Sequence, residues 1–305
     1  MSRILVTGKN GQVGFELQRR LARLGRVTAA GRDEMDLADP DSIRNMLRNT
    51  APNLIVNAAA YTAVDQAESE PALVLAINGV APGILAEEAK RLGAALIHYS
   101  SDYVFDGSKT APYTEDDAPR PISAYGRSKL AGEQAIQSVD VPHLILRTSW
   151  VYGARGKNFL LTILRLAKER EELAVVDDQV GAPTWCQVIA AATGGILQDL
   201  GYGQARFRDA CDAKRGIYNL TAAGQTSWHG FAAAILALGA SAQQGQSDFA
   251  LTRVPALKPI KTEQYPLPAQ RPRNSLLSNA KIQSTFGLVM PGWESSLADC
   301  MSSAQ

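Results

Sequence analysis

The chain opens with a short apolar strand that runs directly into three glycines, and this arrangement constrains the fold more than any other feature. Arg3–Val6 is apolar and β-branched, and the glycines follow with GxxGxxG spacing just before a helical pattern. Glycines let the backbone turn tightly and approach a pyrophosphate, whose charge the free N–H groups of a helix start can hold. The alternative is a glycine turn that serves only helix–sheet packing. The residues expected to line a dinucleotide-binding loop are Gly8, Asn10, Gly11, Gln12, Val13 and Gly14.

Short apolar segments alternate with helical patterns through the first half of the chain. The expected strands are 27–30, 54–56, 95–99 and 144–148, and the expected helices are 40–49, 71–92 and 122–137. Asp39 suits the cap of the helix that begins at Pro40. This alternation implies βαβ units, right-handed crossovers and a parallel sheet buried on both faces. We therefore predict an α/β fold with a doubly wound, Rossmann-like parallel sheet, in which residues 1–150 form an NAD(P)-binding domain.

The regular pattern fades after about residue 150. Helices are expected at 158–170 and 187–200, and a strand is expected at 173–176. The region 255–272 is rich in proline, and we expect it to be an ordered loop that crosses a surface. Residues 151–305 are expected to form mainly a smaller C-terminal α/β domain that binds the substrate. The chain is expected to return to the first domain at about 183–222.

Composition narrows the class of partner and the compartment. The net charge of +1 gives no electrostatic case for nucleic acid or an anionic membrane as a partner. Cys186, Cys211 and Cys300 are odd in number and have no metal-ligand spacing, which favours a reducing cytoplasm. We expect no apolar run near the roughly 20 residues that span a bilayer, and no signal peptide before the first strand. The histidines, His98, His143 and His229, show no ligand spacing, and His98 and His143 are expected to be structural.

The end of the second predicted strand is where a dinucleotide-binding sheet usually meets the adenosine ribose. Gly31 leaves open the place that an acidic residue often fills, and Arg32 could pair with a 2′-phosphate, which favours NADPH over NADH. The alternative for Arg32 is a solvated surface arginine. Asp36 and Leu37 are expected to edge the adenine. The small residues after the third strand, which would let the cofactor lie close to the backbone or simply pack together, are Ala58, Ala59 and Ala60, followed by Tyr61.

Tyr125 and Lys129 are four residues apart on a predicted helix, so their side chains share one face. A free tyrosine has a pKa of about 10, and a nearby ammonium favours the phenolate and lowers that pKa. The lysine could also hold the ribose of a nicotinamide by hydrogen bonds. The same spacing arises by chance on any exposed helical face. The pair therefore predicts a proton-handling site only in combination with other features.

Two serines supply that combination, because they directly follow the fourth predicted strand. Ligands of open α/β sheets bind beyond the carboxyl ends of the strands. A hydroxyl placed there can hydrogen-bond a substrate carbonyl and polarise it. Ser101 is the better candidate for this role, and strand alternation leaves Ser100 open, with a place beside the cofactor. Together these features predict an NAD(P)-dependent oxidoreductase.

Seven segments spread along nearly the whole chain carry a resemblance to the extended short-chain dehydrogenase/reductase superfamily, and within it to the dTDP-4-dehydrorhamnose reductase family. The matching segments are GKNGQVG (8–14), NAAAYTAVDQAE (57–68), HYSSDYVF (98–105), YGRSKLAGE (125–133), RTSWVY (147–152), DQVGAPT (178–184) and RPRNSL (271–276). The resemblance implies reduction of the C4 ketone of a dTDP-linked 6-deoxy sugar by NADPH or NADH. Such a reaction is the last step in making dTDP-L-rhamnose for cell-surface polysaccharide.

The resemblance also implies roles for individual residues. Tyr125 would give the proton, Lys129 would tune it and hold the ribose, and Ser101 would bind the keto oxygen, although the family usually has threonine there. Asp102 would lie beside the sugar, with Trp150 as the nearby aromatic residue. The residues that resemble nucleotide contacts are Asn158 and Arg271. Some members bind magnesium through glutamates that can come from two subunits, and on this resemblance Glu16 is a candidate ligand in a homodimer. The alternative for Glu16 is a solvated helical glutamate.

Other functions remain open at the level of sequence. The same scaffold serves other sugar-nucleotide 4-ketoreductases, epimerases and dehydratases. A dehydratase would want a glutamate beside Asp102, where Tyr103 stands instead. A non-catalytic regulatory subunit is the alternative from another class, and the retained tyrosine, lysine and hydroxyl argue against it. The sugar, its C4 stereochemistry and the nucleotide base rest on resemblance alone.

Overall fold

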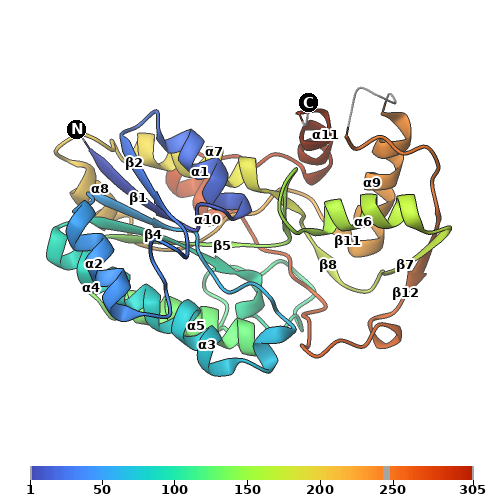
Figure 1. The fold of residues 1–305 in the computed structure, drawn as a ribbon, viewed down its shortest axis with the longest axis horizontal. Coiled ribbons are helices and arrows are strands. Elements are labelled where there is room, and N and C mark those ends of the chain that lie inside the picture. Colours follow the sequence, from blue (N-terminus) through green and yellow to red (C-terminus); the bar gives the residue numbers. More distant parts are fainter. Residues whose placement is uncertain (1, 243–247, 304–305) are drawn as a thin grey trace.

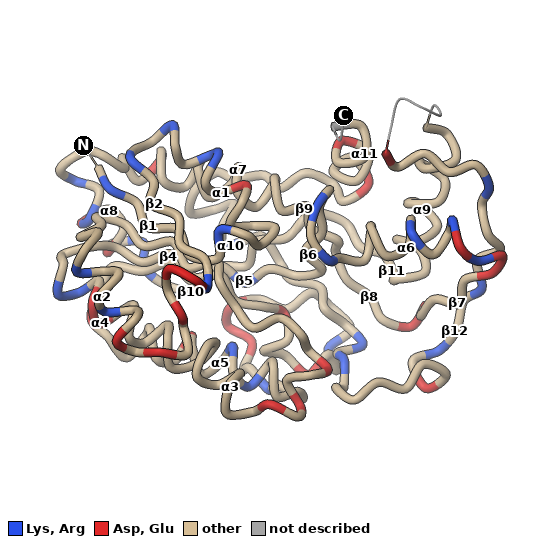
Figure 2. The backbone as a smooth tube through the Cα atoms, in the orientation of Figure 1, with Lys and Arg blue, Asp and Glu red and all other residues tan. Residues whose placement is uncertain are grey.

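The computed structural model describes residues 2–242 and 248–303, which form two parts side by side. Figure 1 shows a central sheet with helices on both faces and, beside it, a smaller part built of helices and short strand pairs. Basic and acidic residues are interspersed over both parts (Figure 2), as the net charge of +1 suggests.

The central sheet has six parallel strands in the order β10-β5-β4-β3-β1-β2. After β2 the chain crosses to the other side of β1 and forms β3, so the direction of winding reverses between β1 and β3. A crevice for ligands lies outside the carboxyl ends of the strands at such a reversal. The strands are β1 (Arg3–Thr7), β2 (Arg26–Ala30), β3 (Leu54–Asn57), β4 (Ala95–Ser101), β5 (His143–Thr148) and β10 (Gly216–Asn219). The doubly wound sheet is confirmed.

Helices cover the sheet on both faces, because its strands are apolar on both sides. One buried cluster joins the sheet to α1 (Gln12–Leu21) and α7 (Cys186–Asp199). Another joins it to α2 (Pro40–Thr50), α4 (Ala81–Leu92) and α5 (Ala124–Gln137). The predicted cap of α2 is confirmed, since Asp39 Oδ1 accepts the Asp41 N–H at 2.9 Å.

Residues 71–92 form one continuous helix in which α3 (Pro71–Leu75) leads through a π-helical turn, η2 (Ala76–Val80), into α4. By length and composition its 22 residues could cross a membrane, so the expectation that no apolar run approaches this length was wrong. The helix packs against α5 and α2, and 56% of its most apolar stretch is buried inside the fold. A core helix accounts for this segment.

The smaller part has its own apolar core. Buried side chains of α6 (Phe159–Glu169), α9 (Trp228–Ser241) and α11 (Trp293–Ser303) pack with β7 (Glu172–Val176) in one cluster. Its short strands pair as β6 (Val151–Tyr152) with β9 (Thr184–Trp185) and β8 (Val180–Gly181) with β11 (Thr226–Ser227). The remaining elements are η1 (Gln66–Glu68), η3 (Asp102–Val104), α8 (Phe207–Ala213), η4 (Thr262–Gln264) and α10 (Ala280–Phe286).

The proline-rich region is not wholly a loop, which corrects the expectation for 255–272. It contains β12 (Ala256–Ile260), which pairs in parallel with β7. The pair is a two-stranded sheet, so β12 has a free edge where Pro259, which lacks an N–H, costs no ladder bond. The chain then returns to the central sheet, where the ring of Phe286 on α10 lies 5.2 Å from that of Tyr218 on β10.

Candidate active site

The glycine loop lies against the loop that follows β3. Gly8 has φ +72°, and a Cβ there would lie 2.9 Å from the backbone of Ala59. A Cβ on Gly14 would lie 2.1 Å from the Gly8 carbonyl oxygen. Gly11 is the N-cap of α1, so the first N–H groups of the helix have no side-chain cap. This backbone cradle, which any side chain would fill, fits the pyrophosphate of a dinucleotide.

An acidic side chain does lie at the end of β2, which corrects the expectation that Gly31 leaves this position without one. Glu34 reaches back from three residues downstream, accepts the Gly31 N–H at 2.8 Å and pairs with Lys9 of the glycine loop. The Lys9 contact and the Gly31 N–H hold the pKa of Glu34 below its usual value. Arg32 is exposed beside this pair. Sequence reasoning missed Lys9, in the glycine loop, and Glu34, just after β2.

The two residues expected at the adenine have different surroundings. Leu37 is 8% exposed and belongs to the core between the sheet and α2. Asp36 accepts the Ala38 N–H at 2.9 Å and so closes the turn before α2. Leu37 therefore has a packing role in this arrangement, and Asp36 shapes the turn.

The loop 58–61 is held by Asn78, which the sequence analysis did not single out. Asn78 Oδ1 accepts the Tyr61 N–H at 2.9 Å, and its Nδ2 donates to the Tyr61 carbonyl at 3.0 Å and to Ser128 Oγ at 3.1 Å. Asn78 lies in the π-helical turn η2, a distortion that is frequent at functional sites. The contact joins the loop after β3 to the helix that carries Tyr125 and Lys129.

Tyr125 and Ser101 are brought together at the carboxyl end of β4. Burial raises the pKa of Tyr125 to about 12, a hydrogen bond with Ser101 opposes the rise, and the charge of Asp102 adds to it. The ring of Tyr103 meets that of Tyr125 edge-on, with centroids 5.4 Å apart. Ser101 Oγ also donates to Asp102 Oδ1 at 2.9 Å and accepts the Tyr103 N–H at 3.1 Å. The geometry favours Ser101 over Ser100 as the partner of Tyr125.

Lys129 lies one helical turn further along α5 and is 1% exposed. Its Nζ donates to the Tyr99 carbonyl oxygen at 2.6 Å. Burial lowers the pKa of Lys129 to about 8, and the carboxylate of Glu133 acts in the opposite direction. The groups that act on Tyr125 are its buried surroundings, Ser101 and Asp102, so the expected lowering of the tyrosine pKa by Lys129 does not occur in this arrangement.

Unpartnered polar atoms gather at the carboxyl ends of β4 and β5. Within residues 2–242 and 248–303, the buried Ser100 Oγ and Thr148 Oγ1 have no hydrogen-bond partner. Burial raises the pKa of Asp102 to about 6, while the hydroxyl groups of Ser275, Ser101 and Ser149 oppose the rise. Buried polar atoms are normally hydrogen-bonded, so this cluster indicates a place for a polar ligand.

Trp150 follows β5 in an unusual backbone conformation. Its φ is +48°, which a bulky residue rarely adopts and which occurs most often at functional sites. Its ring stacks on that of Trp228, with centroids 3.5 Å apart and 8° between planes. A Cβ on Gly181 would lie 2.4 Å from the Trp150 ring, so the stack also depends on that glycine. Trp228, at the start of α9, was missed by the sequence analysis.

A pocket of about 860 Å³ adjoins this stack. Phe159 and Trp228 line it from the smaller part of the molecule, together with the segment 262–273. Ile122 and Asp106 line it from the side of the sheet, three residues before Tyr125 and four after Asp102. Residues close in sequence to Tyr125 and Asp102 thus line the pocket, and its size suits one end of an extended ligand.

Arg271 and Asn158 both join the two parts of the molecule. Arg271 lines the pocket and donates two bonds to the Asp65 carboxylate, at 3.1 and 2.7 Å. Asn158 caps α6 by accepting the Leu161 N–H at 3.1 Å, and its Nδ2 donates to Gln12 Oε1 at 2.9 Å. The amide of Asn158 is thus engaged within the protein rather than offered to a nucleotide.

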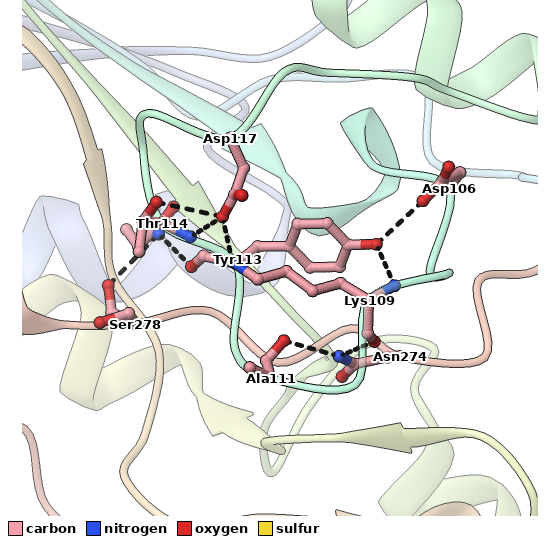
Figure 3. Close-up of polar contacts among 9 residues, drawn as sticks. Asp106, Lys109, Ala111, Tyr113, Thr114, Asp117, Asn274 and Ser278 are labelled. Carbon is pink, nitrogen blue, oxygen red and sulfur yellow. Dashed lines mark hydrogen bonds and ion pairs between the residues drawn. The ribbon is translucent and has the colours of Figure 1, made fainter.

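The wall that contains Asp106 is fixed by hydrogen bonds to the segment that follows Arg271 (Figure 3). Tyr113 donates from its hydroxyl to Asp106 Oδ1 at 2.9 Å and accepts the Lys109 N–H at 3.1 Å. Asn274 Nδ2 donates to the carbonyl oxygens of Lys109 and Ala111 at 2.7 and 3.0 Å. The motif RPRNSL therefore supports the pocket through Asn274 as well as through Arg271.

The expected magnesium site gains no support. Glu16 lies on α1, and its carboxylate is 3.8 Å from Arg19 Nη1. Across the described ranges 2–242 and 248–303, no three His, Cys, Asp or Glu side chains gather in a way that could hold a metal ion.

Comparison with known proteins gives one consistent relationship. The family model of the RmlD substrate binding domain matches residues 1–305. The dTDP-4-dehydrorhamnose reductase of Burkholderia thailandensis is 50% identical over 299 residues, which cover 98% of each chain. That of Escherichia coli K12 is 44% identical over 297 residues, 95% of this chain and 94% of the relative.

Solved structures agree with these sequence matches. The dTDP-4-dehydrorhamnose reductase of Bacillus anthracis in complex with NADP has a TM-score of 0.85 and 32% identity, over 98% of this chain and 99% of that one. The same enzyme from Clostridium acetobutylicum also has a TM-score of 0.85, at 34% identity over 98% of both chains. The chain therefore belongs to the RmlD family, within the extended short-chain dehydrogenase/reductase superfamily.

Proposed function

We propose that the chain is an NAD(P)-dependent oxidoreductase that reduces the C4 ketone of dTDP-4-dehydro-6-deoxy-L-mannose to give dTDP-L-rhamnose. This reaction is the last step of dTDP-rhamnose synthesis for cell-surface polysaccharide. The names of relatives 43–50% identical over nearly their full length support the substrate. NADPH or NADH is the hydride donor, and the NADP-bound relative supports a nicotinamide cofactor.

One observation carries the chemistry: Tyr125 lies beside Ser101, at the ends of β4 and β5 where buried polar atoms have no partner. A ketone oxygen placed between the hydroxyls of Ser101 and Tyr125 would accept hydrogen bonds from both. Both hydrogen bonds would strengthen as negative charge develops on the ketone oxygen during reduction. The cluster around Ser100, Thr148 and Asp102 would receive the polar groups of the ring and of the nicotinamide ribose.

The proton step belongs to Tyr125. Because burial raises its pKa to about 12, the phenol is neutral at physiological pH and can donate. NADPH or NADH, when bound, would supply the hydride, and Tyr125 would give its proton to the ketone oxygen, so that the ketone becomes a secondary alcohol. Lys129 lies one turn away, where it would hold the ribose hydroxyls and compensate the phenolate until a proton returns.

The remaining parts divide between the two ligands. Residues 1–150, with a return at about 183–222, would hold the cofactor through the glycine loop, the segment 58–61 and either Arg32 or Glu34 at the ribose. Residues 151–305 would mainly hold the sugar nucleotide, with Trp150 beside the sugar and the 860 Å³ pocket for the nucleotide. Arg271 would release the Asp65 carboxylate and contact a nucleotide phosphate in its place. The spacing and odd number of cysteines favour a cytoplasmic location. The assembly that we propose is a homodimer.

An assay of the purified protein tests the function. The protein is mixed with NADPH or NADH and a dTDP-4-keto-6-deoxy sugar, and the loss of cofactor absorbance is followed while the product is identified. We expect stoichiometric oxidation of the cofactor and formation of the 4-hydroxy sugar. Absence of oxidation with both cofactors would exclude the reductase, and epimerisation without net cofactor use would point to the epimerases of the same scaffold.

A further inference from the structure

A buried polar chain runs across three strands of the sheet to Lys129. Thr7 Oγ1 lies 2.6 Å from Asn57 Oδ1, Asn57 Nδ2 lies 2.9 Å from His98 Nδ1, and His98 Nε2 lies 3.4 Å from Lys129 Nζ. All four side chains are 1% exposed. This series of hydrogen bonds begins at the loop 58–61, here called the cofactor loop, because the Ala59 N–H donates to Thr7 Oγ1 at 3.0 Å. His98 and Asn57 therefore link the loop to the lysine.

The direction of each hydrogen bond in this chain follows from its first donor. Thr7 Oγ1 accepts from Ala59, so its own O–H points to Asn57 Oδ1. The Asn57 amide is thereby oriented with its N–H₂ group toward His98 Nδ1. Nδ1 must then be the acceptor, and the proton of a neutral imidazole lies on Nε2. The chain thus selects one tautomer of His98.

That tautomer places an N–H donor against Lys129. A lysine ammonium has only donors, so the 3.4 Å contact with His98 Nε2 is favourable only for the neutral amine, which can accept. Burial and the charge of Lys129 lower the pKa of His98 well below its usual value, so the imidazole is neutral. Glu133 on α5 also acts on Lys129, and its carboxylate is paired with Arg147 on β5 at 2.6 Å. The Tyr99 carbonyl oxygen accepts from Lys129 Nζ at 2.6 Å.

We propose that His98 is a positioning residue, held as the Nε2–H tautomer by Thr7 and Asn57, that sets how readily Lys129 carries its charge. Through Ala59, the chain connects the backbone of the cofactor loop to the charge of the lysine. The inference about Lys129 rests on its proposed role in the reaction. The tautomer of His98 is independent of that role, so the two can fail separately.

The tautomer is measured by long-range ¹H–¹⁵N correlation NMR of the histidine rings in the full-length protein. We expect His98 to show a protonated Nε2 and an unprotonated Nδ1 from pH 6 to 9. His143 is an internal reference in the same spectrum, because its Nδ1 lies 2.9 Å from the Val141 carbonyl oxygen and must carry the proton. A wild-type His98 with its proton on Nδ1 overturns the proposal, whether or not the enzyme reduces the keto sugar.

Asn57→Asp reverses the tautomer by design. The new carboxylate can accept both the Thr7 O–H and a His98 Nδ1–H, which leaves Nε2 as an acceptor for the Lys129 ammonium. We expect the proton of the neutral His98 ring to move from Nε2 to Nδ1. The fall of kcat/KM at high pH, which follows the loss of the Lys129 charge, should move upward by about 1 pH unit, the smallest shift expected of such a neighbour. Asn45→Asp, on the exposed face of α2, is the control for added charge and should move neither.

Two results with Asn57→Asp contradict the proposal. One is an unchanged His98 tautomer, which would show that Asn57 does not select it. The other is an exchanged tautomer with an unmoved high-pH limb, which would show that His98 does not govern the charge of Lys129. If the variant does not fold, the wild-type tautomer alone decides the first half, and Thr7→Val, which removes the hydroxyl that orients Asn57, replaces it. With Thr7→Val we expect a mixture of both His98 tautomers, and a single unchanged tautomer would overturn the proposal.

Discussion

The edge of the sheet and the pocket beside it hold their charged groups in different ways. Asp102 and Lys129 at the sheet are 3% and 1% exposed, and burial moves both pKa values toward neutrality, to about 6 and about 8. The side chains of Asp65 and Arg271 beside the pocket are 36% and 20% exposed. Their mutual hydrogen bonds lower the pKa of Asp65 and raise that of Arg271, although burial of Arg271 acts in the opposite direction.

The difference separates two tasks. Groups whose pKa is shifted by burial toward the working pH suit proton chemistry, because both protonation states are within reach. A group that an ion-pair partner keeps charged suits the binding of a charged ligand, because the ligand can replace the partner. On this view, changes at the edge of the sheet alter the rate, whereas changes beside the pocket alter the apparent affinity for the substrate. The following predictions test this division from the largest expected effect to the smallest.

Tyr125→Phe removes the proton donor and is expected to lower kcat by about 10²–10⁴-fold, the usual contribution of a general acid. Cofactor binding should be nearly intact, since the glycine loop is untouched. A steady-state turnover assay measures kcat, and fluorescence titration with NADPH measures cofactor binding. Tyr202→Phe is the control, because its hydroxyl contacts the Arg3 carbonyl at the opposite end of the sheet. Near-normal turnover of Tyr125→Phe would remove this residue as the donor.

Gly8→Ala should weaken cofactor binding, because the new Cβ would lie 2.9 Å from the backbone of Ala59. We expect a cost of about 1–3 kcal/mol from the close approach, in addition to about 1–2 kcal/mol for the positive φ. Gly93→Ala is a matched control, since its φ is +66° and no described atom lies within 4 Å of the new Cβ. Equal dissociation constants for NADPH in the two variants would refute the role of the cradle.

Asp102→Asn should make stability less dependent on pH. Burial raises the pKa of Asp102 to about 6, so between pH 4 and 6 the folded state binds more protons than the unfolded state. The contribution of this group therefore falls as the pH rises through that window, by on the order of 3 kcal/mol. We expect the variant to unfold at a higher temperature than the wild type at pH 8 but not at pH 4. An equal difference at both pH values would show that Asp102 is not protonated in the fold.

Arg271→Ala is expected to raise KM for the sugar nucleotide by roughly tenfold and to change kcat little, as the loss of about one charged contact does. Asp65→Asn removes the competing carboxylate and should lower KM or leave it unchanged. Both variants lose the same partly exposed ion pair, so their thermal stabilities should fall by a similar, small amount. Parallel rises in KM for both variants would mean that the pair only supports the pocket wall.

The sequence predicted the features that depend on local pattern. Strands β1 to β5 of the sheet were evident because they are apolar, short and bounded by glycine or polar residues, whereas the edge strand β10 was not predicted. Tyr125, Lys129 and Ser101 could be grouped because each lies at a fixed position relative to a strand end or a helical turn. Ser101 lies beside Tyr125, and burial rather than the lysine dominates the pKa of the tyrosine.

The features that the sequence did not predict depend on contacts between distant residues. Arg271 and Asp65 are separated by 206 positions, and no local pattern predicts their pairing. Glu34 reaches back to the Gly31 N–H along a flexible side chain, which spacing does not specify. Asn78 acts through a π-helical turn that has no sequence signature of its own. The helix α9 was missed because its residues are apolar around most of its surface, so it lacks the expected period.

The most direct test of the central claim follows the hydrogen that reduces the sugar. The enzyme is given a dTDP-4-keto-6-deoxy sugar and NADPH that carries deuterium at both C4 positions of the nicotinamide ring, and the product is analysed by mass spectrometry and NMR. The proposed function predicts one deuterium on C4 of the sugar for each cofactor oxidised. A 4-hydroxy product without deuterium at that carbon, or no product while the cofactor stays reduced, would contradict it.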